Sequence, residues 1–184
     1  MRVLLFSERL CAPYDEGIKN FAVHLVRALA AEHNVLALTS SGQEDLEYGI
    51  KNVDANRLLL STRLGRTIRR FRPQVIVYVP TACGTLFSFV RTRILRLYGR
   101  GAPTVLITLQ PRRYTAVGKF LIGRLAPDWV LAQSTRTVEL LRGLGCRTAL
   151  LPPAVDAQRF RPASPVEKAA LRTEFLAQPQ WWPM

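Results

Sequence analysis

Polar residues that follow short apolar runs are the strongest candidates for chemistry in this 184-residue chain. Glu16 and Gly17 come after the apolar run Arg2–Phe6 and directly before a helical pattern. Glycine lets the backbone approach a ligand closely, and the free amides of a first helical turn favour an anion such as a diphosphate. Lys19 and Asn20 add side-chain donors to this candidate site. The alternative is that Gly17 only closes a turn, because the passage has neither a Walker ending nor the glycines of a dinucleotide motif.

A second group of candidates follows the later apolar runs. Gln110, Arg112 and Arg113 come after the run Thr104–Leu109, and two arginines at the end of a strand can clamp a phosphate. A solvated loop is the alternative reading of this passage. Tyr78 and Ser134 lie at the ends of two other runs, and we include both among the diphosphate- or acceptor-binding candidates.

Few residues can do acid–base or metal chemistry. Glu8 and Glu16 are the only acids placed near predicted strand ends, and neither a Ser-His-Asp nor a Cys-His set can be assembled. Cys11, Cys83 and Cys146 fit no metal-ligand spacing and no disulfide framework, so we expect reduced packing thiols and no bound metal. The catalytic residues are not identifiable from the sequence.

Strands and helices alternate along the chain, which predicts an α/β fold with a doubly wound, mostly parallel, Rossmann-like sheet. The expected strands are Arg2–Phe6, Asn34–Leu38, Val53–Leu60, Val75–Val79, Thr104–Leu109, Trp129–Ala132 and Thr148–Leu151. The expected helices begin near Ile18, Leu64, Leu86, Tyr114, Ser134 and Val166. Ligands of such sheets bind beyond the carboxyl ends of the strands, where the candidates above lie.

Periodicity predicts which faces of the helices are buried. In the first helix, Ile18, Phe21, Ala22, Leu25, Ala28 and Leu29 recur at three- and four-residue spacing. In the helix from Leu86, the expected inner face consists of Phe87, Val90, Ile94 and Leu97.

The chain changes character near residue 152. We expect a Rossmann-like domain over residues 1–152, followed by a proline-rich linker and the start of a second domain over 153–184. The adjacent residues Trp181 and Trp182 need a partner surface to bury them. We therefore expect a further domain to follow in the complete protein.

Charge is distributed unevenly. The net charge is +13, and 14 of the 26 basic residues lie between Asp54 and Asp128, a window without any acidic residue. Such a field attracts phosphate, nucleic acid or an anionic membrane, although solvated helix faces are the simpler explanation. A membrane contact would use basic residues with aromatic inserts. The expected basic residues are Arg91, Arg93, Arg96, Arg112, Arg113 and Lys119, and the expected inserts are Phe87, Phe89 and Phe120.

The hydrophobic content and the N-terminal residues indicate where in the cell the protein is expected. Hydrophobic residues make up 48% of the chain, which is typical of a globular protein. No apolar run approaches the roughly 20 residues of a membrane-spanning helix, and the start of the chain does not resemble a signal peptide. We expect a cytoplasmic protein, with peripheral contact to the inner face of the membrane.

Four stretches resemble the N-terminal domain of family 4 glycosyltransferases, which have the two-domain GT-B fold. They are the Pro-x-x-Glu-Gly-x-x-x-Phe passage from Pro13 to Phe21, the Arg-Pro-Gln-Val-Ile-Val run of 72–77, the Pro-Asp-Trp-Val-Leu-Ala-Gln-Ser run of 127–134, and the Pro-Pro-Ala-Val-Asp-Ala-Gln-Arg-Phe-Arg-Pro segment of 152–162. The last resembles the segment that joins the two domains of the family. Together they cover the chain from Met1 to about Phe175.

The resemblance implies sugar transfer from a nucleotide sugar to an acceptor, with retention at the anomeric carbon and without metal or cofactor. It also implies that this half binds mainly the acceptor, and that the Gly17 loop lies against the diphosphate. The family often has histidine where this chain has Gln110 and near Tyr78, so no histidine role transfers. The donor domain with its Glu-x7-Glu motif is absent from these 184 residues, and without it we expect no catalysis.

The alternative function is a non-enzymatic, basic module that binds a nucleotide or nucleic acid. The sequence does not identify the donor sugar, the acceptor or the oligomeric state.

Overall fold

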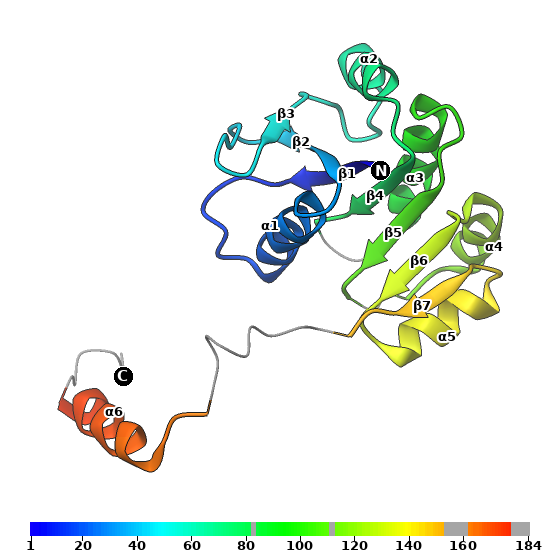
Figure 1. Ribbon diagram of the computed structural model, residues 1–184. Helices are drawn as coiled ribbons and strands as arrows, with labels where there is room; N and C mark the ends of the chain where they lie inside the picture. The colour runs from blue at the N-terminus through cyan, green and yellow to red at the C-terminus, as the bar shows by residue number, and fades with distance from the viewer. Residues whose placement is uncertain (82–83, 111–112, 153–161, 178–184) are drawn as a thin grey trace. The chain divides into compact units, whose positions relative to one another are not determined.

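The computed structural model describes residues 1–81, 84–110, 113–152 and 162–177 (Figure 1). By internal contacts the chain divides into two compact units, Met1–Pro152 and Pro153–Met184, and each is described by itself. Of the second unit, the structure describes helix α6, Pro165–Ala177. Ser164 and Glu167 form a reciprocal cap before it, in which each backbone amide donates to the other side chain at 2.7 and 3.2 Å. Trp181 and Trp182 lie outside the described residues.

The first unit is built on one parallel sheet of seven strands, in the order β3-β2-β1-β4-β5-β6-β7 (Figure 1). The strands are β1 Arg2–Arg9, β2 Asn34–Ser41, β3 Ile50–Asn52, β4 Val75–Val79, β5 Thr104–Thr108, β6 Trp129–Ala132 and β7 Thr148–Leu150. All strands except the short edge strand β3 are rich in β-branched and aliphatic residues, which is typical of parallel strands buried on both faces. The predicted doubly wound α/β fold is confirmed.

The order of the strands reverses between β1 and β4, which lie side by side. Val3 of β1 pairs with Val35 of β2 on one side and with Val75 of β4 on the other. From β1 the chain winds outward to β3, then returns to β4 and continues in the opposite direction to β7. The carboxyl ends of β1 and β4 therefore form the topological switch point, where open α/β sheets bind ligands.

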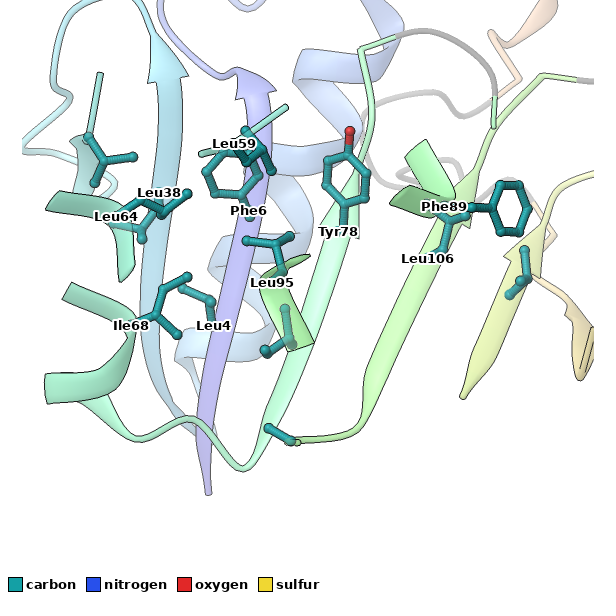
Figure 2. Packing of buried hydrophobic residues seen from close by; sticks show 14 of the residues in the cluster. Leu4, Phe6, Leu38, Leu59, Leu64, Ile68, Tyr78, Phe89, Leu95 and Leu106 are labelled. Carbon is teal, nitrogen blue, oxygen red and sulfur yellow. The ribbon is translucent and has the colours of Figure 1, made fainter. Parts of the chain in front are cut away.

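Helices cover both faces of the sheet. Their bounds are α1 Gly17–Ala30, α2 Thr62–Phe71, α3 Leu86–Tyr98, α4 Ala116–Leu125 and α5 Thr135–Gly143. Residues of α2 to α5 share one core with Leu4 and Phe6 of β1, part of which Figure 2 shows. α1 packs on the opposite face, where Val23 and Val26 share a second core with Val3 and Leu5.

Hydroxyl side chains fix the starts of four helices in the first unit. Ser61, Thr85, Thr115 and Ser134 each accept a hydrogen bond from a backbone amide in the first turn that follows. Such caps satisfy amides that have no partner within the helix. At α1, Glu16 occupies the cap position without a side-chain cap bond.

The predicted face of α3 was wrong, whereas that of α1 is largely confirmed. In α3, the fully buried residues include Ser88, Phe89 and Thr92, whereas Phe87 and Leu97 are 58% and 68% exposed. The hydroxyls of Ser88 and Thr92 keep hydrogen-bond partners although they are buried. The Ser88 hydroxyl oxygen accepts from the Thr85 amide at 3.1 Å, and the Thr92 hydroxyl donates to the Ser88 carbonyl oxygen at 2.7 Å.

In α1 most of the predicted face is confirmed. Ala22 is buried, and Ile18, Phe21, Leu25 and Leu29 pack partly buried against the second core, whereas Ala28 is exposed. The prediction left out Lys19, Val23 and Val26, which are also buried.

The third predicted strand was also wrong in position. β3 spans Ile50–Asn52, and the segment expected as a strand is a loop that contains Asp54 and Leu59 at φ +45° and +60°. These left-handed conformations end an extended chain. Val53 and Leu59 are nevertheless buried, so apolar residues that suggested a strand pack as loop residues.

Candidate functional site

A crevice of about 550 Å³ lies at the switch point, beyond the carboxyl ends of β1 and β4. Most of the side chains around it are polar or charged, which suits a hydroxylated or charged ligand. Its lining residues are Glu8, Arg9, Glu16, Ser40, Ser41, Ala55, Asn56, Arg57, Leu59, Thr81 and Arg91. They come from the ends of β1 and β2, the residue before α1, the loop after β3, the segment after β4, and α3.

Several hydrogen bonds converge on Glu8 in the wall of the crevice. Its carboxylate accepts hydrogen bonds from the Tyr78 hydroxyl, from the Arg91 guanidinium and, at 2.8 Å, from the Thr81 hydroxyl. The side chains of Glu8 and Arg91 are 19% and 15% exposed, so the ion pair is largely shielded from water. Arg91 Nε also donates to the backbone oxygen of Arg57 at 2.6 Å. These bonds fix the orientations of Glu8 and Arg91 in the wall of the crevice.

The Tyr78 phenol is held neutral in this cluster. Burial raises its pKa well above the ordinary value of 10.0, and the neighbouring charge of Glu8 raises it further, against the opposing effect of Arg91. Figure 2 shows the Tyr78 ring among the core residues, with its hydroxyl at one end. The neutral Tyr78 hydroxyl therefore acts as a hydrogen-bond donor to the Glu8 carboxylate.

A second hollow of about 500 Å³ adjoins the first and shares Glu8, Arg57, Thr81 and Arg91 with it. Its remaining wall is largely apolar. That wall consists of Leu58, Pro80, Thr85, Phe87 and Ser88. The Glu8–Arg91 pair therefore stands between a polar compartment and a more apolar one.

The predicted residues around α1 have mixed positions. Glu16 lines the crevice. Lys19 does not offer a free donor, since its buried ammonium lies 3.2 Å from Glu16, 3.8 Å from Asp15 and 3.5 Å from the Pro13 carbonyl oxygen. Gly17 begins α1, and a Cβ at this position would meet no atom within 4 Å. Asn20 is exposed on α1.

The other predicted binding residues do not gather at the crevice. Tyr78 lies beneath Glu8, as described above. Ser134 caps α5 by accepting from the Thr137 amide at 3.4 Å, and Gln110 is exposed after β5. Neither is among the described residues that line the crevice. Arg112 lies outside the described residues.

The predicted membrane-facing residues also separate into groups. Arg91 is paired with Glu8, and Arg96 binds Asp128 with two hydrogen bonds of 2.9 and 2.8 Å, so both have acidic partners that the local sequence did not suggest. Phe89 was wrong as a membrane insert, because it is fully buried. Arg93 is exposed on α3.

Arg113 and Lys119 line a separate hollow of about 570 Å³ between α4 and α5, whose wall also contains Arg136 and Glu139. On the outer side of α4, Phe120 is 61% exposed, and the Arg124 guanidinium lies 4.7 Å from the centre of its ring. Among the described residues, no carboxylate forms an ion pair with Arg113, Lys119 or Arg124. No described helix has the length and apolarity to cross a bilayer.

The sequence missed much of the crevice. Ser40, Ser41, Asn56 and Arg57 were not among the candidates, although the serines follow the second predicted strand and strand ends were the guiding signal. Arg57 carried no such signal, because its loop was expected to be a strand.

We found no model of a known protein family that matches the chain, and no curated protein that matches it.

Proposed function

We propose that this chain is the acceptor-binding half of a glycosyltransferase that transfers a sugar from a nucleotide sugar. The observation that carries the proposal is the polar crevice at the switch point, with Glu8 held by three donors and arginines around it. Sugars are bound by polar side chains that both donate and accept hydrogen bonds, and phosphates by arginine. The resemblance of four sequence stretches to family 4 glycosyltransferases supports the same reading.

The side chains have distinct roles in this proposal. Ser41, Asn56 and Thr81 are hydrogen-bonding groups for acceptor hydroxyls, and Arg57 neutralises negative charge. Glu8 and Arg91 are positioning residues for the acceptor, since their mutual pair is fixed by Tyr78 and Thr81. In this proposal the sugar donor and catalysis belong to a donor domain of the kind that the family resemblance implies, and we expect residues 1–184 alone to be inactive.

Sugar transfer by the complete product of the gene tests this proposal. Radiolabelled UDP-, GDP- and ADP-sugars are offered together with polar and lipid extracts as acceptors, and products are separated by chromatography. We expect transfer from one donor class, with at least about a tenfold loss in kcat/KM for Arg57→Gln. The matched control is Arg142→Gln, an exposed arginine at the end of α5, which should leave the rate unchanged. Absence of transfer from every donor, or equal losses in the two variants, would refute the proposal.

We also propose that the outer face of α4 contacts an anionic membrane surface from the cytoplasmic side. Val117 and Phe120 are 68% and 61% exposed there, and Lys119 and Arg124 stand beside them. Exposed aromatic and basic residues on one helix favour the interface of an anionic bilayer. Co-sedimentation with phosphatidylcholine vesicles should require added phosphatidylglycerol and should weaken with salt. Phe120→Ser should reduce it, whereas Leu46→Ser, at an exposed loop position, should not.

A further inference from the structure

The crevice has an excess of positive charge that its own carboxylates do not neutralise. Glu8 is paired with Arg91, and Glu16 lies 3.2 Å from the Lys19 ammonium. Arg9 and Arg57 are exposed, and among the described residues no carboxylate forms an ion pair with either. Guanidinium groups in this setting favour phosphate or carboxylate, which they bind through parallel hydrogen bonds.

The adjoining hollow has the opposite character. Leu58 and Phe87 are 36% and 58% exposed on its wall, beside Pro80. Phe87 lies in the first turn of α3, which the reciprocal Thr85–Ser88 cap fixes, so the ring is held at the wall by a defined helix start. An exposed aromatic ring lining a concave surface is typical of a site that receives an apolar group.

Arg57 belongs to both hollows, so one ligand can reach the cation and the apolar wall together. We propose that the acceptor is an anionic amphiphile, with its phosphate or carboxylate at Arg57 and its hydrocarbon part against Leu58 and Phe87. The inference rests on the proposed function, because it names the class of acceptor that the transferase takes. A lipid phosphate and a soluble phosphate with a short apolar group share this chemistry.

Binding of octyl phosphate to the 184-residue chain, below its micelle-forming concentration, tests the proposal by calorimetry. Inorganic phosphate tests binding to the Arg57 cation alone. Octyl glucoside carries the same hydrocarbon tail without the negative charge and tests the apolar contact alone. Burial of a few methylene groups strengthens binding by about tenfold or more, so octyl phosphate should bind at least about tenfold more tightly than inorganic phosphate. Octyl glucoside should bind more weakly than octyl phosphate.

Two variants locate the site. Phe87→Ser should weaken octyl phosphate binding by about fivefold or more and leave inorganic phosphate binding unchanged, because only the apolar contact is lost. Leu97→Ser is the matched control, since Leu97 is exposed on the same helix and is not among the described lining residues. Arg57→Gln should weaken binding of both octyl phosphate and inorganic phosphate.

Three results would overturn the inference: equal affinities for octyl phosphate and inorganic phosphate, equal effects of Phe87→Ser and Leu97→Ser, or octyl glucoside binding as tightly as octyl phosphate. A dodecyl phosphate that binds more tightly still identifies a lipid source, whereas a loss of affinity identifies a short soluble one. The measurement contains no nucleotide sugar. Failure of sugar transfer with octyl phosphate binding intact therefore refutes only the proposed function, and transfer without this binding refutes only the inference.

Discussion

α3 and α4 are consecutive basic helices in the same acid-free window, but their charges are used in different ways. The guanidinium groups of Arg91 and Arg96 in α3 reach Glu8 and Asp128, which lie 83 and 32 residues away in the chain. In α4, Lys119 and Arg124 have no carboxylate partner among the described residues. The α3 arginines therefore stabilise the fold and the crevice, whereas the α4 charges can contact another molecule. A run of basic residues in the sequence does not by itself predict a cationic binding surface.

Removal of Glu8 should give the largest effect. Glu8→Ala leaves Arg91 without its partner in a largely shielded position, and breaking such a pair costs about 3 kcal/mol. Urea unfolding of Glu8→Ala and of Glu139→Ala, an exposed acid on α5, measures the difference. Equal stability of the two variants would show that the Glu8–Arg91 pair does not hold the fold.

Asp128 is expected to come next. Asp128 bonds to Arg96 and to the amide and hydroxyl of Thr104, and Asp128→Asn should cost about 1–2 kcal/mol near neutral pH. Partial burial raises the pKa of Asp128, but the Thr104 hydrogen bonds and the Arg96 charge outweigh it and lower the pKa from 3.8.

The lowered pKa fixes how this contribution depends on pH. A carboxylate with a depressed folded pKa stabilises the protein fully above its unfolded value, and this stability is lost as pH falls through the folded pKa. The stability difference between wild type and Asp128→Asn should be constant above about pH 5 and should shrink below about pH 4. A difference that grows on acidification would contradict the assignment.

Tyr78→Phe should have a smaller effect, about 1 kcal/mol, because Glu8 keeps its bonds from Arg91 and Thr81. Burial keeps the Tyr78 phenol from ionising in the folded protein where an ordinary tyrosine ionises. The change in absorbance at 295 nm between about pH 7 and 11 should therefore be the same in wild type and Tyr78→Phe. A smaller change in the variant would show that Tyr78 titrates and is not held in the cluster.

The α4 charges should give the smallest effect on stability. Lys119→Gln and Arg124→Gln should each change the free energy of unfolding by less than about 0.5 kcal/mol, as is usual for surface substitutions. Denaturation of these variants beside Arg96→Gln sharpens the comparison between α3 and α4. A loss at Arg124 as large as that at Arg96 would remove the distinction.

The architecture could be predicted from the sequence because parallel strands buried on both faces produce continuous β-branched runs, as in Val75–Val79. The buried face of α3 could not. Ser88 and Thr92 satisfy their hydroxyls locally and can therefore be buried, while Phe87 and Leu97 are exposed. In α1 the apolar periodicity correctly marks Ala22 and its neighbours, but it leaves out Val23 and Val26, which are buried as well.

For the candidate site, the sequence predicted the edge of the sheet but not the contacts. The rule that ligands bind beyond strand ends directs attention to Glu8 and Glu16, which line the crevice. The pairing of Glu8 with Arg91 depends on β1 lying beside β4 and on the packing of α3, neither of which the local sequence shows. Lys19 has the charge of an anion-binding residue, but its ammonium already forms ion pairs with Asp15 and Glu16.

Mapping ligand contacts by NMR tests the central claim, that the crevice between β1 and β4 is the acceptor site, most directly. The ¹⁵N-labelled chain is titrated with octyl phosphate, and amide shift changes are assigned. We expect the largest changes at Arg57, Thr81 and Phe87, with small ones at Lys119 and Arg124. Changes centred on α4, or spread evenly over all basic residues, would contradict this claim.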